Sequence, residues 1–203
     1  MTATPAGLLA LPYSGRMKPA FTFAIPLAAL LLGMPAAAQA ASFCAGLDRY
    51  PVNPIVGGAP VDLCRVDARA VLLVNTASAC GFTPQYEGLE KLHQRYGREG
   101  LRVVALPAND FGAQERGSNK QIAEFCQVNY GVTFTVGEKL TTPIRQDPLY
   151  AQLMRVSGKA PKWNFHKYLI TPDGRVQSFD SDVTPQSREL VQAVETALKA
   201  PPR

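Results

Sequence analysis

The sequence lacks a C-x-x-C pair and contains only two histidines, His93 and His166, far apart in the chain. A zinc site built from clustered cysteines and histidines is therefore not indicated, and neither is an ordinary dithiol oxidoreductase. We interpret both histidines as surface or packing residues. Runs of lysine or arginine are also missing, so the formal net charge of +5 does not predict a nucleic-acid surface.

Long apolar runs are missing too, except near the N-terminus. The segment Phe21–Met34 has the length of a signal-peptide core, and Ala38–Ala40 supplies an A-x-A cleavage site. We predict that residues 1–40 form a signal peptide cleaved after Ala40, with Met1 or Met17 as the start. The protein would then be secreted or periplasmic. A transmembrane anchor is the alternative, but the run is short and interrupted by proline.

The remaining part has a size that suits one domain, and we find no internal repeat or interdomain linker after residue 60. All four cysteines, Cys44, Cys64, Cys80 and Cys126, lie in this part, and secretion would place them where disulfides persist. The stretch 41–62 reads as an irregular N-terminal arm or loose hairpin. A Cys44–Cys64 disulfide would pin it, and two independent thiols are the alternative.

Cys80 follows a short apolar run, Val71–Val74, that predicts a buried strand. Thr83 and Pro84 are typical of a helix N-cap and first helical residue, and they predict a helix over 85–98. Cys80 would therefore lie at a helix N-terminus, where unpaired N–H groups favour a thiolate. It is a candidate nucleophile. An inert buried cysteine is the alternative.

The rest of the chain predicts an α/β fold. A second apolar strand at 101–106 completes a βαβ unit, so the loop 107–112 should emerge at the same sheet edge as Cys80. A capping box at Ser118 opens a helix to about residue 129, and Cys126 lies on its apolar face with Ile122, Phe125 and Asn129. Later patterns predict a helix capped by Asp147, a hairpin over 166–179 and a final helix capped by Thr184.

Three long motifs in this order resemble the glutathione peroxidase family, cysteine type, over about residues 63–198. Residues 75–83 (NTASACGFT) resemble the N-x-A-S-x-C-G-x-T signature, residues 107–115 (PANDFGAQE) resemble P-x-N-Q-F-x-x-Q-E, and residues 162–165 (KWNF) contain W-N-F. The resemblance implies a thioredoxin-like fold, with a central mixed sheet flanked by helices, for residues 63–200. It implies no metal, haem or flavin, and the lack of a long insertion before Pro148 favours a monomer.

By this resemblance Cys80 is the peroxidatic cysteine, whose thiolate attacks a peroxide and becomes a sulfenic acid. Trp163 and Asn164 match two of the three hydrogen-bonding residues that the family places around the sulfur; core packing is the alternative for Trp163. The third, a glutamine, is replaced by Asp110. A carboxylate there would act as a proton acceptor for Cys80 or alter the site.

In many cysteine-type members a second cysteine resolves the sulfenic acid as a disulfide, and Cys126 lies in that region. From its helical spacing alone it would be a core residue. The resemblance thus predicts a peroxidase for hydrogen peroxide or organic hydroperoxides, regenerated by a thioredoxin-like protein through Cys80–Cys126, or by glutathione. One alternative is a thiol–disulfide oxidoreductase of the same fold. The other is a non-cycling redox sensor or binding protein in which Asp110 has weakened turnover.

Overall fold

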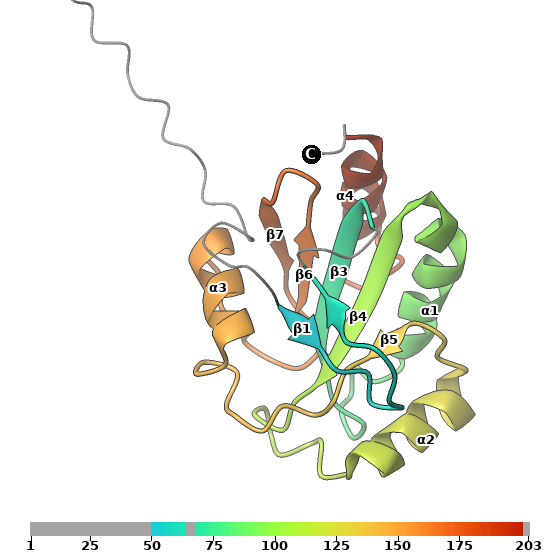
Figure 1. Ribbon diagram of the computed structural model, residues 1–203, viewed down its shortest axis with the longest axis vertical. Coiled ribbons are helices and arrows are strands. Elements are labelled where there is room, and N and C mark those ends of the chain that lie inside the picture. The colour runs from blue at the N-terminus through green and yellow to red at the C-terminus, as the bar shows by residue number, and fades with distance from the viewer. Residues whose placement is uncertain (1–49, 64–67, 201–203) are drawn as a thin grey trace, which may run out of the picture. The chain divides into compact units, whose positions relative to one another are not determined.

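The computed structural model describes residues 50–63 and 68–200, and Figure 1 shows the arrangement of their elements. The predicted signal peptide and the cysteines Cys44 and Cys64 lie outside these residues. In chain order the elements are β1 (Pro51–Val52), β2 (Val61–Asp62), β3 (Ala70–Thr76), α1 (Gln85–Tyr96), a 3-10 turn (Gly97–Glu99), β4 (Leu101–Pro107), α2 (Asn119–Tyr130), β5 (Thr135–Val136), α3 (Pro148–Ser157), β6 (Lys167–Ile170), β7 (Val176–Phe179) and α4 (Arg188–Lys199).

The main sheet has five strands in the order β5-β4-β3-β6-β7. β3 lies at its centre, parallel to β4 and antiparallel to β6, so the sheet is mixed as predicted. All seven residues of β3 are buried, because helices cover both faces, and each buried Val or Leu side chain contributes roughly 1.5–3 kcal/mol. The predicted βαβ unit and the β6–β7 hairpin are both confirmed.

Alternate residues of β3 contribute to two hydrophobic cores, one on each face of the sheet. Leu72 and Val74 pack with α1, α2 and α4, whereas Val71 and Leu73 pack with α3 and the β1–β2 hairpin. The parallel strands β3 and β4 run toward the end of the sheet where α2 lies (Figure 1). Loops that leave these two strands therefore meet between the sheet and α2, which places the residues after Thr76 beside those after Pro107.

The caps of two helices are confirmed, whereas the start of the last helix and the exposure of one α2 residue differ from the prediction. Ser118 and Asp147 cap α2 and α3 as predicted. The final helix begins later than predicted, because the Ser187 N–H closes a turn onto the Thr184 carbonyl (3.0 Å) and the Ser187 hydroxyl accepts from Leu190 N. On α2, Asn129 is exposed rather than part of the apolar face, since its side chain donates to the Phe125 carbonyl.

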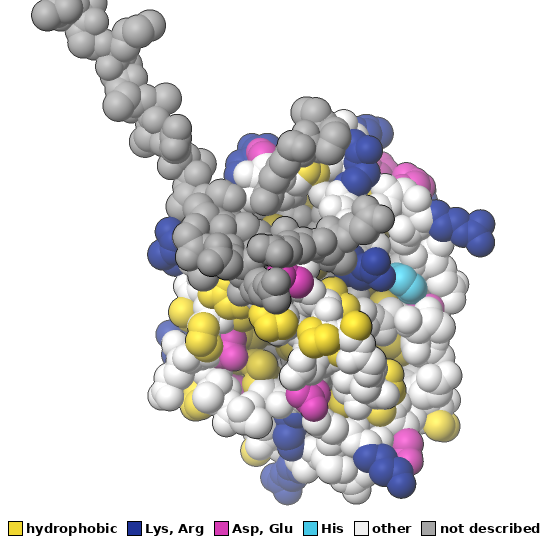
Figure 2. All heavy atoms as spheres, in the orientation of Figure 1, with side chains coloured by type: hydrophobic (Ala, Val, Ile, Leu, Met, Phe, Trp, Pro, Cys, Tyr) yellow, Lys and Arg dark blue, Asp and Glu magenta, His cyan; other side chains and the backbone are white. Residues whose placement is uncertain are grey.

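Residues 50–62, the described part of the arm, form a hairpin, which is one of the two alternatives that the sequence left open. β1 and β2 pair antiparallel, and the connecting loop reaches the sheet edge, where Ile55 N donates to the Val136 carbonyl (2.8 Å). Figure 2 shows hydrophobic side chains gathered over β1 and β2, with acidic and basic side chains interspersed elsewhere on that face. Among residues 50–63 and 68–200, no helix is long and apolar enough to span a membrane.

Candidate active site

Thr83 shapes the loop that carries Cys80. Its hydroxyl accepts a hydrogen bond from Cys80 N (3.0 Å) and donates one to the Ala77 carbonyl (2.9 Å). The predicted role of Thr83 as the cap of α1 is therefore wrong. The helix begins two residues later, Pro84 occupies the capping position, and no side chain caps it. The threonine instead folds residues 77–83 into a tight turn that fixes the cysteine.

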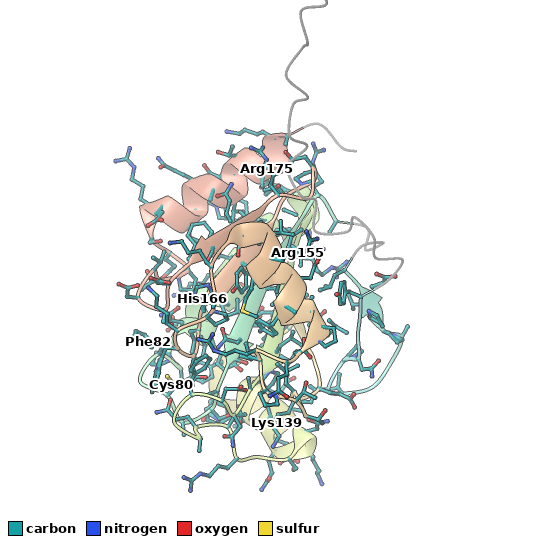
Figure 3. All side chains as sticks on the ribbon, turned by 90° about the vertical axis from the view of Figure 1, so that its left-hand side faces the viewer. Cys80, Phe82, Lys139, Arg155, His166 and Arg175 are labelled. Atoms are coloured by element: carbon teal, nitrogen blue, oxygen red, sulfur yellow. The ribbon has the colours of Figure 1, made fainter. Side chains whose placement is uncertain are left out.

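Cys80 lies just before α1, and 8% of the surface of this residue is exposed. Phe82 N donates to Cys80 Sγ at 3.4 Å, within the range for a hydrogen bond to sulfur. A backbone donor and a helix N-terminus are both features that favour negative charge on a nearby atom. Cys80 and Phe82 lie together at the end of the sheet in Figure 3, while Arg155 and Arg175 lie farther up.

The start of α1 is anchored from the opposite side. Gln85 Nε2 donates to the Ser181 carbonyl (2.7 Å), and the buried Lys167 ammonium donates to the carbonyls of Ser181 (3.2 Å) and Val183 (2.6 Å). Burial lowers the pKa of Lys167 to about 7, and the nearby Asp182 opposes that shift. These bonds fix the loop after β7 against the helix that follows Cys80.

The loop after β4 is bonded directly to the Cys80 loop. The Glu115 carboxylate, 1% exposed, accepts from Ser78 N (2.9 Å) and from the Ser78 hydroxyl (2.8 Å). Ala79 N donates to the Gln114 carbonyl (3.0 Å). Burial raises the pKa of Glu115, and the two hydrogen bonds from Ser78 act in the opposite direction. The two residues before Cys80 are thus held by consecutive residues of the second motif.

Trp163 and Asn164 reach the same end of the sheet. Asn75 Nδ2 donates to the Trp163 carbonyl (3.0 Å), and Phe165 N donates to the Asn75 carbonyl (2.6 Å). Asn164 is fully buried, whereas Trp163 is 39% exposed and its ring lies 5.9 Å from that of Phe111. Trp163 is therefore not a core residue. Its side chain forms part of an accessible apolar surface.

Asp110 takes no part in these contacts. It is exposed, and Asp110 Oδ1 accepts a hydrogen bond from Ile144 N at 2.8 Å. The carboxylate therefore ties the loop after β4 to the segment before α3. Its predicted role as a proton acceptor for Cys80 stays a prediction.

Cys126 lies inside α2 and is 2% exposed. The pKa of its thiol is raised to about 11, chiefly by burial and to a smaller extent by Glu115, while a hydrogen bond with the buried Tyr86 hydroxyl acts in the opposite direction. Cys80 and Cys126 are both free thiols in this structure. A groove of about 580 Å³, lined by Ala79, Gln114, Ile122 and Phe125 among others, runs between the Cys80 loop and α2.

Thr83, Gln114 and Glu115 were not singled out by the sequence analysis as site residues. The signal was present, because all three lie inside the two longest motifs. No group of three or more His, Cys, Asp or Glu side chains able to hold a metal ion occurs in the described ranges.

His166 is confirmed as a packing residue. It is 1% exposed, its Nε2 lies 2.7 Å from the Ser178 hydroxyl, and its ring lies 4.8 Å from that of Tyr168. Burial lowers the pKa of His166 to about 4, although Asp180 opposes this shift.

This burial predicts a loss of stability in mild acid. As the pH falls, the unfolded chain binds a proton at His166 near pH 6.5, whereas the folded chain does so only near pH 4. The contribution of His166 to the free energy of unfolding is complete above about pH 6.5 and is lost as the pH falls to about 4. Over this range the free energy of unfolding changes by up to about 1.4 kcal/mol per pH unit. Urea unfolding of wild type and His166→Gln between these pH values should show the smaller slope in the variant. Equal slopes would contradict the assignment.

Comparison with solved structures defines the class of protein, which has a thioredoxin-like α/β fold. The chain matches a structure described as Trgpx in apo form with a TM-score of 0.60 and 31% identity, over 81% of this chain and all of that chain. A putative thiol:disulfide interchange protein DsbE from Chlorobium tepidum is similar in fold alone, with a TM-score of 0.51 and 21% identity, over 74% of this chain and 93% of that one.

Within this class the family is clear. Residues 49–154 match the family model described as Glutathione peroxidase. The chain is 43% identical to the glutathione peroxidase-like peroxiredoxin HYR1 of Saccharomyces cerevisiae, over 74% of this chain and 96% of that protein. It is also 43% identical to the hydroperoxy fatty acid reductase Gpx2 of Synechocystis sp., over 75% of this chain and 94% of that protein. The chain belongs to the glutathione peroxidase family and is a peroxidase of that family.

Proposed function

We propose that the protein reduces hydroperoxides through Cys80. The thiolate attacks the terminal peroxide oxygen, an S–O bond forms as the O–O bond breaks, and water or an alcohol leaves after taking up a proton. The product is a sulfenic acid on Cys80. The observation that carries this proposal is the Phe82 N–H directed at Cys80 Sγ at the start of α1, on a loop held by Thr83 and Glu115.

The proposed substrates are hydrogen peroxide and organic hydroperoxides. Trp163 is partly exposed, and its ring packs on Phe111, which is half-buried like Phe82 beside the sulfur. Partly exposed aromatic rings provide an apolar contact surface for the organic part of a hydroperoxide. The relative named as a hydroperoxy fatty acid reductase supports this choice.

The proposed resolving residue is Cys126. Its thiol is buried and its pKa is raised to about 11, so it is neutral while α2 is folded. Local opening of α2 would be needed before a Cys80–Cys126 disulfide could form. A thioredoxin-like protein would then reduce this disulfide. Glutathione is the rival reductant.

Hydrogen bonds stabilise helix α2 at both ends, and they would control how often the helix opens for the resolving step. At its start, Ser118 and Gln121 form a capping box, and Lys139 Nζ donates to the Gly117 carbonyl (2.6 Å). Beyond its end, the Glu90 carboxylate accepts from Thr133 N (2.8 Å) and from the Thr133 hydroxyl (2.6 Å).

Loosening one end should therefore speed disulfide formation. Ser118→Ala removes the cap of α2, which is worth about 1 kcal/mol, so opening should become about fivefold more frequent. The measurement is the rate at which the Cys80–Cys126 disulfide appears after one equivalent of hydrogen peroxide, by acid quench and intact mass. The matched control is Ser187→Ala, which removes the equivalent cap of α4 and should leave this rate unchanged. An unchanged or slower rate in Ser118→Ala would exclude opening of α2 as the controlling step.

We also propose that the protein is secreted or periplasmic after cleavage of residues 1–40, with residues 41–62 as an N-terminal arm, and that it acts as a monomer. The A-x-A site at Ala38–Ala40 supports the first point. In that compartment a Cys44–Cys64 disulfide would be stable. N-terminal sequencing of the exported protein would test the cleavage site. The mass of the protein before and after reduction would test the disulfide.

The test of the function is a count of free thiols in the mature protein, before and after one equivalent of hydrogen peroxide. We expect two free thiols at first and rapid loss of both. Loss of Cys80 alone, as a sulfenic acid, would favour an external thiol and leave Cys126 as a core residue. Oxidation without sustained turnover by any thiol reductant would favour a redox sensor, and no reaction within minutes would exclude a peroxidase.

A further inference from the structure

The loop of the β1–β2 hairpin lies against the segment that follows α2 (Figure 1). Ile55 N donates to the Val136 carbonyl (2.8 Å), and Glu138 N donates to the Asn53 carbonyl (2.9 Å). In addition, Asn53 Nδ2 donates to Glu138 Oε2 (3.1 Å). The hairpin loop is therefore bonded at two points to the backbone that leads away from α2.

Gly137 lets the hairpin approach this segment closely. A Cβ atom at this position would lie 2.7 Å from Val52 Cγ1 and 2.6 Å from Leu106 Cδ2, well inside van der Waals contact. Val52 is buried, and the chain continues from it directly into the loop that carries Ile55. The hairpin therefore contacts the segment after α2 through packed side chains as well as hydrogen bonds.

The same segment is bonded to the residue that carries the buried thiol. Beyond the end of α2, Val132 N donates to the Cys126 carbonyl (3.3 Å). Ile55 packs against the hydrophobic cluster that contains Cys126, Val132 and Phe134. The hairpin loop and the last turns of α2 thus share one packed cluster, and opening of the helix at Cys126 would disturb both.

Ile55 and Cys126 also line a common groove. Its volume is about 340 Å³, and it runs between the hairpin loop and α2. Two neighbouring residues of the loop line this groove in different ways. Ile55 is half-buried in the cluster, whereas Val56 is 82% exposed. The loop therefore offers two adjacent apolar side chains, of which only the first is packed.

We propose that the hairpin loop keeps Cys126 inside α2, and that Ile55 is a positioning residue for the resolving step. While Ile55 is packed, α2 stays closed around the thiol. When the loop moves away, the segment after α2 loses its support and the helix opens. Cys126 then attacks the Cys80 sulfenic acid: the S–S bond forms as the S–O bond breaks, and the hydroxyl leaves as water with the thiol proton. This inference rests on the proposed resolving role of Cys126.

The first measurement needs no peroxide. The reduced protein is treated with iodoacetamide, and alkylation of the Cys126 peptide is followed by mass spectrometry, with the Cys80 peptide as internal reference. Ile55→Ala should raise the Cys126 rate relative to the Cys80 rate about tenfold, because the packing that it removes exists only in the closed form. Ile55→Val, a smaller truncation, should raise it about twofold to threefold.

The second measurement is the rate at which the Cys80 sulfenic acid becomes the Cys80–Cys126 disulfide. It is followed after one equivalent of hydrogen peroxide, by acid quench and intact mass. This rate should rise in the two Ile55 variants by the same factors as the alkylation of Cys126. Faster alkylation with an unchanged disulfide rate would contradict the role of Ile55 in the resolving step.

Two control variants separate local opening from a general loss of stability. Val56→Ala truncates the exposed neighbour of Ile55 and should leave both rates unchanged. Leu153→Val, on α3 in the other core, should destabilise the whole protein in urea without changing the Cys126 rate. An unchanged Cys126 rate in Ile55→Ala, or an equal rise in Leu153→Val, would overturn the inference. The expected alkylation rates in a protein whose Cys80 does not react with peroxide would instead refute the proposed function.

Discussion

Cys80→Ser is expected to lower the second-order rate constant for hydrogen peroxide by at least about a thousandfold, because a hydroxyl without a neighbouring base is a weak nucleophile. The Phe82 N–H and the helix N-terminus favour charge on sulfur, but they cannot ionise a serine at neutral pH. Stopped-flow measurement of peroxide consumption, with reductant in excess, gives the rate constant. A loss of less than tenfold would show that another group reacts with peroxide.

Cys126→Ser is the matched control, since it removes the other buried free thiol found in residues 50–63 and 68–200. It should consume the first equivalent of peroxide at the wild-type rate, because Cys80 is intact. Turnover driven by a thioredoxin-like reductant should then stop, while turnover driven by a small thiol should continue. A first equivalent as slow as in Cys80→Ser would contradict the assignment of the two roles.

Glu115→Ala is expected to cost about 3 kcal/mol of unfolding free energy, because it leaves the Ser78 N–H and hydroxyl donors without a buried acceptor. The Cys80 loop would lose its main bond to the second motif, so the peroxide rate should fall by at least about tenfold. Urea unfolding and the peroxide rate of the same preparation give the two values.

The control for this change is Glu124→Ala on α2. Glu124 is exposed and lies 4.0 Å from Lys120, a surface pair worth little. Its replacement should change the unfolding free energy by less than about 0.5 kcal/mol and leave the peroxide rate unchanged. If Glu115→Ala were as mild as Glu124→Ala, the carboxylate would not hold the loop.

Much of the fold was predictable because its signals are local. Four consecutive apolar residues define β3, Ser118 and Asp147 have side chains that cap helices, and the turn at Pro172–Gly174 joins β6 to β7. The two wrong caps, Thr83 and Thr184, share one cause. Each threonine closes a turn before its helix, which a sequence pattern does not distinguish from a cap.

The segments that carry the candidate site residues could be placed from the sequence, but their hydrogen bonds could not. The motifs single out Cys80, Trp163 and Asn164, and the fold brings the segments that carry them to one end of the sheet. Asn164 Nδ2 donates to Gln114 Oε1, fifty residues away in the chain. The buried hydrogen bond from Ser78 to Glu115 likewise depends on loops that meet only once the sheet has formed.

The burial of Cys126 affects how well the enzyme keeps its activity at high peroxide concentration. In the proposed cycle the Cys80 sulfenic acid has two fates: capture by Cys126, or attack by a second peroxide to give the irreversible sulfinic acid. The first fate waits for α2 to open, and the second becomes faster with peroxide concentration. The stability of this twelve-residue helix would therefore determine the dose of oxidant above which the enzyme inactivates itself.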